Sequence, residues 1–135
     1  MRKREKKIIR LNSLCVYDLI DFTEKLGFQM SEQLASALCT NQASTIVYGL
    51  YEESTLLAVL SASLFLSLPN EQVKEGKFIY ISALQTLPDL SDDTKDMCIK
   101  ALMQAINIDA IQLGAERIIV AEYLAKSLEL LQEGS

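Results

Sequence analysis

Residues 77–122 read KFIYISALQTLPDLSDDTKDMCIKALMQAINIDAIQLGAERIIVAE. The start of this stretch, Phe78–Leu87, is rich in β-branched and aromatic residues and predicts a strand that Pro88 stops. Its end, Arg117–Glu122, predicts a second strand. A long helix between two strands makes them run parallel with a right-handed crossover, so the stretch predicts a strand–helix–strand unit.

The helix of this unit has clear start and stop signals. Ser91 is an N-cap residue, and Asp92 and Asp93 put negative charge in the first turn, where it suits the helix dipole. Gly114 is a typical C-terminal stop. An apolar stripe with helical spacing lies between them, made of Ile99, Leu102, Met103, Ile106, Ala110 and Leu113. We expect Met97 and Met103 to lie in the core.

The rest of the chain predicts the elements that complete a mixed sheet. The segment Leu56–Leu66 has a length that permits a helix, but its place after the short turn Glu52–Ser54 favours a hairpin strand. The other predicted elements are a strand over Ile8–Leu11, a helix over Val16–Leu26, a helix that Ser31 caps, a strand over Thr45–Tyr51 and a last short helix over Leu124–Gln132. The fold class is therefore α/β: a mostly antiparallel sheet with one parallel strand–helix–strand unit, flanked by helices.

The 135 residues fit one domain, 1–135, and half of them are hydrophobic, which is enough for a sizeable core. Residues 1–10 hold six of the thirteen basic residues and one of the eighteen acidic ones. The remainder carries seven basic and seventeen acidic residues, a net charge of −10. Residues 1–7 then form either an arm for an anionic surface or a flexible solvated terminus. We favour the terminus and expect no nucleic-acid partner, because an acidic body repels a polyanion.

The chain contains no histidine, so the commonest general base and metal ligand is missing. Its three cysteines, Cys15, Cys39 and Cys98, are far apart and odd in number, so we expect neither a metal site nor a disulfide framework. Reduced thiols favour the cytoplasm. The most apolar run, Leu56–Leu68, is too short for a bilayer, so no membrane association is expected.

Two segments carry a family resemblance that covers roughly residues 8–134. Ile81–Pro88 resembles the fourth strand of the GNAT superfamily of acyl-CoA-dependent N-acetyltransferases, and Leu113–Val120 resembles that family's junction between the long helix and the fifth strand. The resemblance implies a sheet that opens between these strands, with acetyl-CoA in the gap and an unknown amine, small molecule or protein, as acceptor. It implies cofactor contacts at backbone groups near Leu84 and Thr86 and at the helix start near Thr94 and Lys95. No side chain stands out as a general base.

The sequence departs from the family pattern in three places. The family's cofactor loop is rich in glycine, whereas Ser91–Cys98 has none and carries three aspartates that would face a pyrophosphate. Leu130 or Leu131 stands where the family has a tyrosine that protonates the leaving thiolate. The family continues with two more strands, so the Arg117–Glu122 strand is expected to be an open edge that pairs in a homodimer.

These departures leave two functions open. One is an acyl-CoA-dependent N-acetyltransferase with a divergent loop. The other is a catalytically degenerate protein of the same fold that acts as a binding or regulatory module, through self-association at the open edge. Whether the protein is an enzyme is therefore undecided at the level of sequence.

Overall fold

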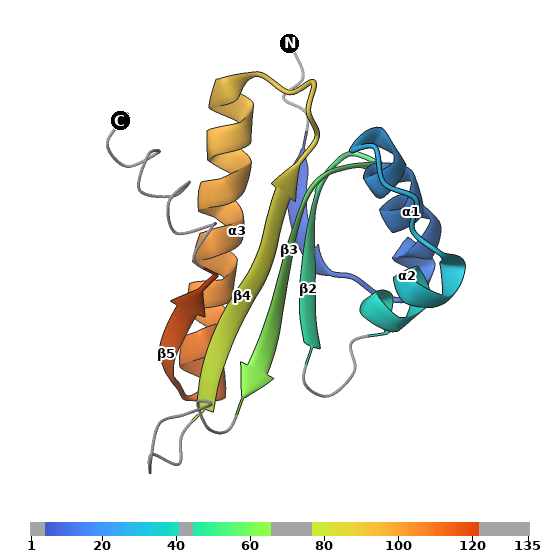
Figure 1. Cartoon of the computed structure of the whole chain (residues 1–135). Coiled ribbons are helices and arrows are strands. Elements are labelled where there is room, and N and C mark those ends of the chain that lie inside the picture. Colours follow the sequence, from blue (N-terminus) through green and yellow to red (C-terminus); the bar gives the residue numbers. More distant parts are fainter. Residues whose placement is uncertain (1–4, 41–44, 66–76, 122–135) are drawn as a thin grey trace.

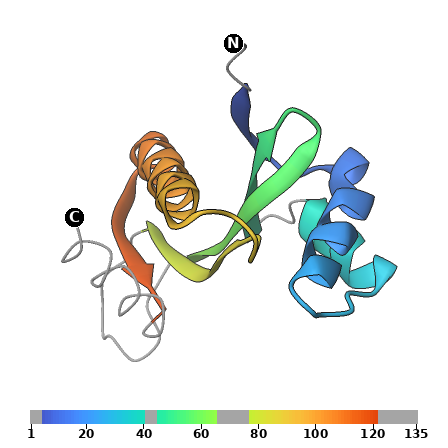
Figure 2. The same ribbon diagram turned by 90° about the horizontal axis from the view of Figure 1, so that it is seen from above.

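The structure is a computed structural model that describes residues 5–40, 45–65 and 77–121. In this part of the chain, a five-stranded sheet lies between α3 on one side and α1 and α2 on the other (Figures 1 and 2). The elements are β1 Lys6–Arg10, the 3-10 turn η1 Ser13–Cys15, α1 Val16–Lys25, α2 Glu32–Cys39, β2 Thr45–Glu52, β3 Thr55–Phe65, β4 Lys77–Thr86, α3 Asp92–Leu113 and β5 Ala115–Val120.

The strands lie in the order β1-β2-β3-β4-β5, with every neighbouring pair antiparallel except β4 and β5, which are parallel. This arrangement confirms the predicted mixed sheet and its strand–helix–strand unit. The segment after Glu53 is confirmed as a hairpin strand, since Glu52 pairs with Thr55 across a two-residue turn in which Glu53 has a φ of 55°.

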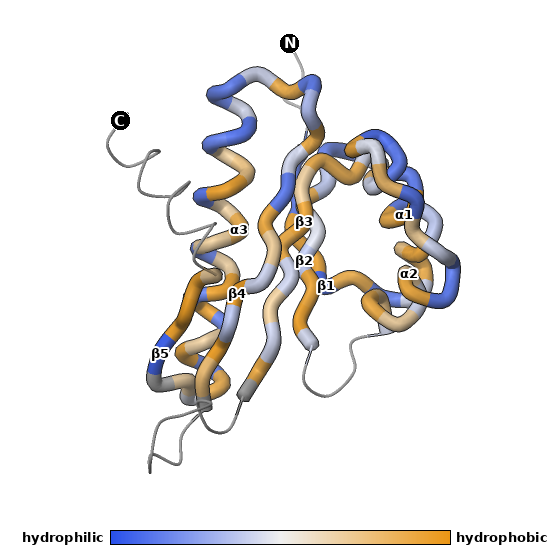
Figure 3. Tube along the Cα trace, in the orientation of Figure 1, coloured by the Kyte–Doolittle hydropathy of each residue, from blue (hydrophilic) through white to orange (hydrophobic). Residues whose placement is uncertain are grey.

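Apolar side chains on both faces of the sheet form the core, and orange segments recur along the strands in Figure 3, between white and blue ones. Ile79 and Ile81 of β4 are fully buried, as are Leu102 and Ile106 of α3, the helix that covers this face of the sheet. Burying each such side chain contributes roughly 1.5–3 kcal/mol. The predicted stripe on α3 is therefore confirmed, but Met97 is 37% exposed, so its assignment to the core is wrong.

Two tyrosines of β2 attach opposite faces of the sheet to the helices. The Tyr48 hydroxyl donates to the Asp109 carboxylate of α3, and the Tyr51 hydroxyl donates to Asp18 Oδ2 of α1 at 2.8 Å. Because residues three apart on a strand point to opposite faces, one strand supports both helix layers.

The predicted caps are confirmed. Ser31 Oγ accepts from the Leu34 N–H at 3.1 Å, and Ser91 Oγ accepts from the Thr94 N–H at 3.2 Å. Gly114 closes α3 with a left-handed φ of 72°, which costs glycine little. The predicted helix over Leu124–Gln132 and residue Glu122 of the last strand lie outside the described residues.

Candidate active site

The parallel strands β4 and β5 separate at one point of the sheet. Their pairing runs from Lys77 opposite Ala115 to Ile81 opposite Val120, and the Ala121 N–H then donates to the Ile81 carbonyl at 3.0 Å. Beyond Ile81, β4 continues to Thr86 with β3 on its other edge, and no β5 residue within 77–121 pairs with it. We call this place, Ile81 to Thr86 with Val120 and Ala121, the β4–β5 fork.

A β-bulge lies at the base of the fork. Ser61 of β3 pairs with Ala83, whereas Ala62 pairs with Ile81, so Ser82 is an extra residue in β4. The Ser82 hydroxyl donates to the Ser61 carbonyl at 3.2 Å, which ties the bulge to β3. A bulge bends its strand and increases the local twist, so it turns the end of β4 away from β5.

Among the described residues, no strand pairs with the edge of β4 that lies beyond Ile81 and faces away from β3, and we call this the free edge of β4. The Leu87 N–H donates to the Leu57 carbonyl of β3 at 2.9 Å, so the backbone at Leu87 points toward β3. In an antiparallel pair the direction of these groups alternates from residue to residue. The N–H and C=O groups of Leu84 and Thr86 therefore point away from β3, toward the fork.

The start of α3 lies at the same end of the sheet as the end of β4 (Figure 1). Asp92 and Asp93 are exposed in its first turn, and Thr94 and Lys95 are partly buried. A helix start normally offers free N–H groups to an anion, but here Ser91 already accepts from Thr94. No residue from Leu87 to Lys95 has a positive φ, so the turn is built without the left-handed conformations for which glycine is needed.

The predicted cofactor-contact residues thus fall into two groups. Leu84 and Thr86 lie on the free edge of β4, and Thr94 and Lys95 lie on the first turn of α3, with the short segment 87–91 between the groups. The edge of β4 at the fork is of the kind that can accept an extended chain by main-chain hydrogen bonds. The two aspartates at the helix start are negatively charged, whereas a pyrophosphate, itself an anion, needs positive charge beside it.

The resemblance to the family also implies a bulge in this strand, and the sequence carries a signal for its position. Ile79 and Ile81 follow the alternation of a strand, and the next core-facing residue, Leu84, comes three positions later instead of two. Leu84 pairs with the fully buried Leu60, whereas Ile81 pairs with Ala62 on the same face. A break in period within a strand indicates an inserted residue.

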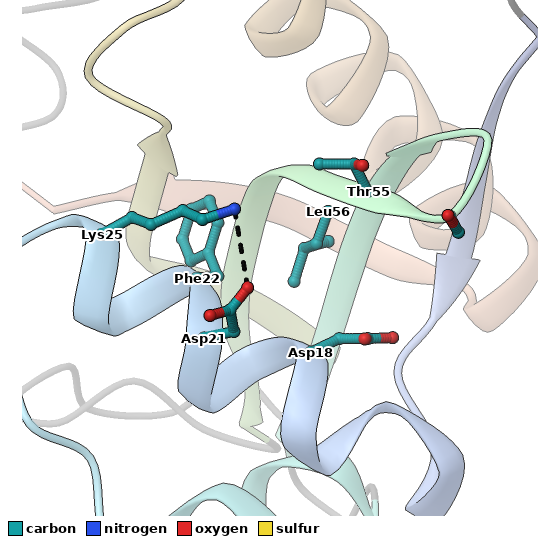
Figure 4. Close-up of a pocket in the computed structure, with 7 residues that line it drawn as sticks. Asp18, Asp21, Phe22, Lys25, Thr55 and Leu56 are labelled. Carbon is teal, nitrogen blue, oxygen red and sulfur yellow. Dashed lines mark ion pairs between the residues drawn. The ribbon is translucent and has the colours of Figure 1, made fainter.

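A separate pocket lies between α1 and the turn that joins β2 to β3 (Figure 4). It has a volume of about 90 Å³ and is lined by Asp18, Asp21, Phe22, Lys25, Ser54, Thr55 and Leu56. Lys25 Nζ lies 3.5 Å from Asp21 Oδ2, and Asp18 accepts from Tyr51. The charged groups of the pocket thus have partners within the protein, and no β4 or α3 residue lines it, so we do not include it in the site.

The three cysteines, Cys15, Cys39 and Cys98, are buried and form no disulfide. Burial, together with the nearby Cys15 and Asp18, raises the pKa of Cys39 to about 11, and burial also raises the pKa of Cys98. A thiol that stays protonated is a poor nucleophile, so these two cysteines do not suit covalent catalysis. Within the described ranges, no three His, Cys, Asp or Glu side chains form a group that could hold a metal ion. None of the helices found there is long and apolar enough to cross a membrane.

Comparison with known proteins finds the same fold in solved structures. No protein-family model matches the chain, and no curated protein matches its sequence. An aminoglycoside N-acetyltransferase in complex with CoA superposes with a TM-score of 0.74 at 12% identity, over 98% of this chain and 88% of the other. An aminoglycoside acetyltransferase from an uncultured soil metagenomic sample, in complex with sisomicin, gives 0.70 at 19% identity, over 95% and 86% of the two chains.

A GNAT family acetyltransferase from Staphylococcus aureus gives a TM-score of 0.70 at 13% identity, over 87% of this chain and 86% of the other. Across these structures the shared feature is the mixed sheet with its parallel strand–helix–strand unit. The chain therefore has the GNAT acetyltransferase fold. At these identities the likeness concerns the fold, and the chemistry has to be argued from the site.

Proposed function

We propose that the protein is an acyl-CoA-dependent N-acetyltransferase that acts on an amine. The observation that carries this proposal is the β4–β5 fork, in which a bulge at Ser82 leaves the backbone of Leu84 and Thr86 unpaired with β5. A strand edge of this kind accepts an extended amide-containing chain by main-chain hydrogen bonds. The pantetheine arm of CoA contains such amides. Structures with this fold include one solved with CoA, which supports the same ligand here.

The fork would bind the acyl donor, and the main contribution of the protein to the reaction would be to hold the thioester and the amine in position. Acetyl-CoA supplies an activated thioester, and an amine that attacks it needs alignment more than covalent help from the protein. Leu84 and Thr86 would hold the arm along β4, and the first turn of α3 at Thr94 and Lys95 would lie beside the phosphates. The proposal covers small-molecule and protein amines alike as acceptors.

One observation favours the second function, a binding or regulatory module without catalysis. Asp92 and Asp93 stand in the first turn of α3, where the pyrophosphate of CoA would lie. Each like-charge contact lowers the affinity for the phosphates. The predicted homodimer through Arg117–Glu122 would belong to this function, and β5 is the terminal strand of the sheet in the described part of the chain.

Calorimetric titration with acetyl-CoA separates the two functions. A ligand at a hundred times its Kd stabilises the folded state by about 2.7 kcal/mol, so a thermal shift should accompany binding. Thr86→Pro removes the one N–H that faces the fork at this position, and Thr86→Ala removes the same side chain but keeps the N–H. We expect at least tenfold weaker binding for Thr86→Pro, and affinity within about twofold of the original for Thr86→Ala, because one hydrogen bond contributes about 1 kcal/mol and an unmet partner costs more.

The result that contradicts catalysis is an absence of binding and of thermal shift at millimolar acetyl-CoA. Equal binding by both variants would show that the ligand does not use the free edge of β4. Circular dichroism of both variants checks that the sheet is intact.

A further inference from the structure

The strand β1 is the terminal strand of the described sheet at the end opposite β5 (Figure 2). It pairs with β2 on one side, and no described strand pairs with its other side, which we call the outer edge of β1. The Leu11 N–H donates to the Val47 carbonyl at 2.9 Å, and the Glu53 N–H donates to the Glu5 carbonyl at 3.1 Å. These two bonds show that the backbone on either side of β1 points toward β2 at Leu11 and at Glu5.

The backbone groups of the outer edge follow from these two bonds. In an antiparallel pair the direction of the N–H and C=O groups alternates from residue to residue. The groups of Lys6, Ile8 and Arg10 therefore point away from β2. Each of these residues offers one donor and one acceptor to an added strand, and an open edge of this kind can pair with another extended chain.

The side chains along the outer edge are basic on either side of an apolar residue. Lys6, Lys7 and Arg10 are exposed, and none of them forms an ion pair with another described residue. Ile8 is partly buried and packs against the core. Because side chains alternate along a strand, Lys6, Ile8 and Arg10 lie on one face of the sheet. An added strand would therefore meet a basic, an apolar and a basic side chain in register.

These charges argue against a second copy of β1 as the occupant of the edge. Antiparallel pairing centred on Ile8 would put Lys6 of one copy directly opposite Arg10 of the other, and like charges in this position destabilise a pair of strands. Carboxylates at the same positions would stabilise it. The chain as a whole carries a net charge of −5, but its long-range repulsion of an acidic segment is screened beyond about 8 Å at physiological ionic strength. The paired side chains would lie closer than this.

We propose that the outer edge of β1 binds an extended acidic segment of a partner protein, which adds an antiparallel strand to the sheet. An apolar residue of the segment lies opposite Ile8, and acidic residues two positions before and after it lie opposite Arg10 and Lys6. Glu52 of β2 already lies opposite Lys6 on the other side, so Arg10 makes the stronger charge contact. The inference does not depend on the proposed function, because the fork lies between β4 and β5.

The probe is a short capped peptide of threonines with a central valine and one glutamate two positions to either side of it. Its affinity is measured by fluorescence anisotropy of a labelled copy. We expect the same peptide with lysines in place of the glutamates to bind at least tenfold more weakly, because both cross-strand pairs change from attraction to repulsion. Binding of the glutamate peptide should weaken as salt is added.

Two variants of Ile8 test the main-chain bonds. Ile8→Pro removes an N–H that faces the added strand, and an edge strand tolerates proline at such a position. It should weaken binding of the glutamate peptide at least tenfold, because the partner carbonyl is left without a donor. Ile8→Ala also removes the isoleucine side chain but keeps the N–H, so its affinity should stay within about threefold of the original.

Arg10→Glu tests the charge contact at an exposed position. It should weaken binding of the glutamate peptide about fivefold, and it should strengthen binding of a peptide whose first glutamate is replaced by lysine. Lys100→Glu makes the same change of charge at an exposed position of α3 and is the control. It should change neither affinity by more than about twofold.

Each part of the inference can be overturned separately. Equal binding of the glutamate and lysine peptides would overturn the charge complementarity, and equal binding by Ile8→Pro would overturn strand addition. If no peptide binds, the inference is wrong, and the basic residues serve only to keep the edge from pairing with other chains. Binding to phosphatidylserine vesicles without binding to the glutamate peptide would also overturn it. If circular dichroism shows that Ile8→Pro fails to fold, Arg10→Glu with its matched peptide still decides the outcome.

Discussion

The acidic start of α3 gives the sharpest prediction about the cofactor site. The double variant Asp92→Asn/Asp93→Asn removes two exposed charges from the first helical turn and keeps the size of both side chains. Asparagine also suits a helix start, so the local structure should persist. If CoA binds as proposed, its pyrophosphate lies near these two carboxylates, and the variant should bind CoA more tightly.

The size of the effect follows from the exposure of both carboxylates. In a water-like dielectric, two unit charges about 6 Å apart repel by roughly 0.7 kcal/mol. Two carboxylates and two phosphate charges form four such pairs, so their total repulsion is about 3 kcal/mol. Screening at physiological ionic strength reduces this repulsion to roughly 1.3 kcal/mol. We therefore expect about tenfold tighter binding. The same variant should unfold slightly more easily, because each aspartate stabilises the helix by about 0.3–1 kcal/mol through its interaction with the helix dipole.

The assay is calorimetric titration with CoA at low and at high salt. Asp21→Asn/Glu24→Gln on α1 is the matched control, since it removes the same net charge from exposed positions on a helix that covers the other face of the sheet. The gain should appear in the α3 variant alone and shrink to less than about threefold at high salt. An equal gain in the control would show a general effect of net charge, and no gain in either variant would refute a phosphate site at the start of α3.

Two further predictions concern stability. Gly49→Ala should destabilise the protein by about 1–3 kcal/mol in urea denaturation. The reason is that the new Cβ would lie 2.7 Å from Leu11 Cδ2 and 2.8 Å from Leu56 Cδ1, and both leucine side chains are buried. An unchanged midpoint of urea denaturation would show that the two leucines can move aside. The free energy of unfolding should fall as pH rises from 9.0 toward about 11, because the folded protein holds the proton of Cys39 up to its raised pKa while the unfolded chain releases it earlier. Burial also raises the pKa of Tyr51, which lowers the free energy of unfolding in the same direction at high pH. Cys39→Ala should therefore reduce the dependence of the free energy of unfolding on pH without abolishing it. An unchanged pH dependence would contradict the assignment to Cys39.

Much of the fold is written in local signals of the sequence. Ser91 and Gly114 mark the ends of α3, and their side-chain and backbone chemistry acts within one helical turn, so no distant contact is needed to predict it. The period of Leu102 and Ile106 likewise indicates a buried face without saying what covers it. The prediction for Met97 failed because this apolar side chain lies beside the buried face of the helix, which begins with Cys98 and continues through Leu102, and not on it.

The site depended on contacts that sequence alone does not specify. Residues 77–122 determine a strand, a capped helix, a second strand and an acidic turn, because propensity, capping and charge are local properties. The bulge at Ser82 and the separation of β4 from β5 depend on the register of three strands from distant parts of the chain. Register is set when side chains of β3, β4 and β5 pack together on the core, so only the tertiary structure decides where the sheet opens and which side chains face the opening.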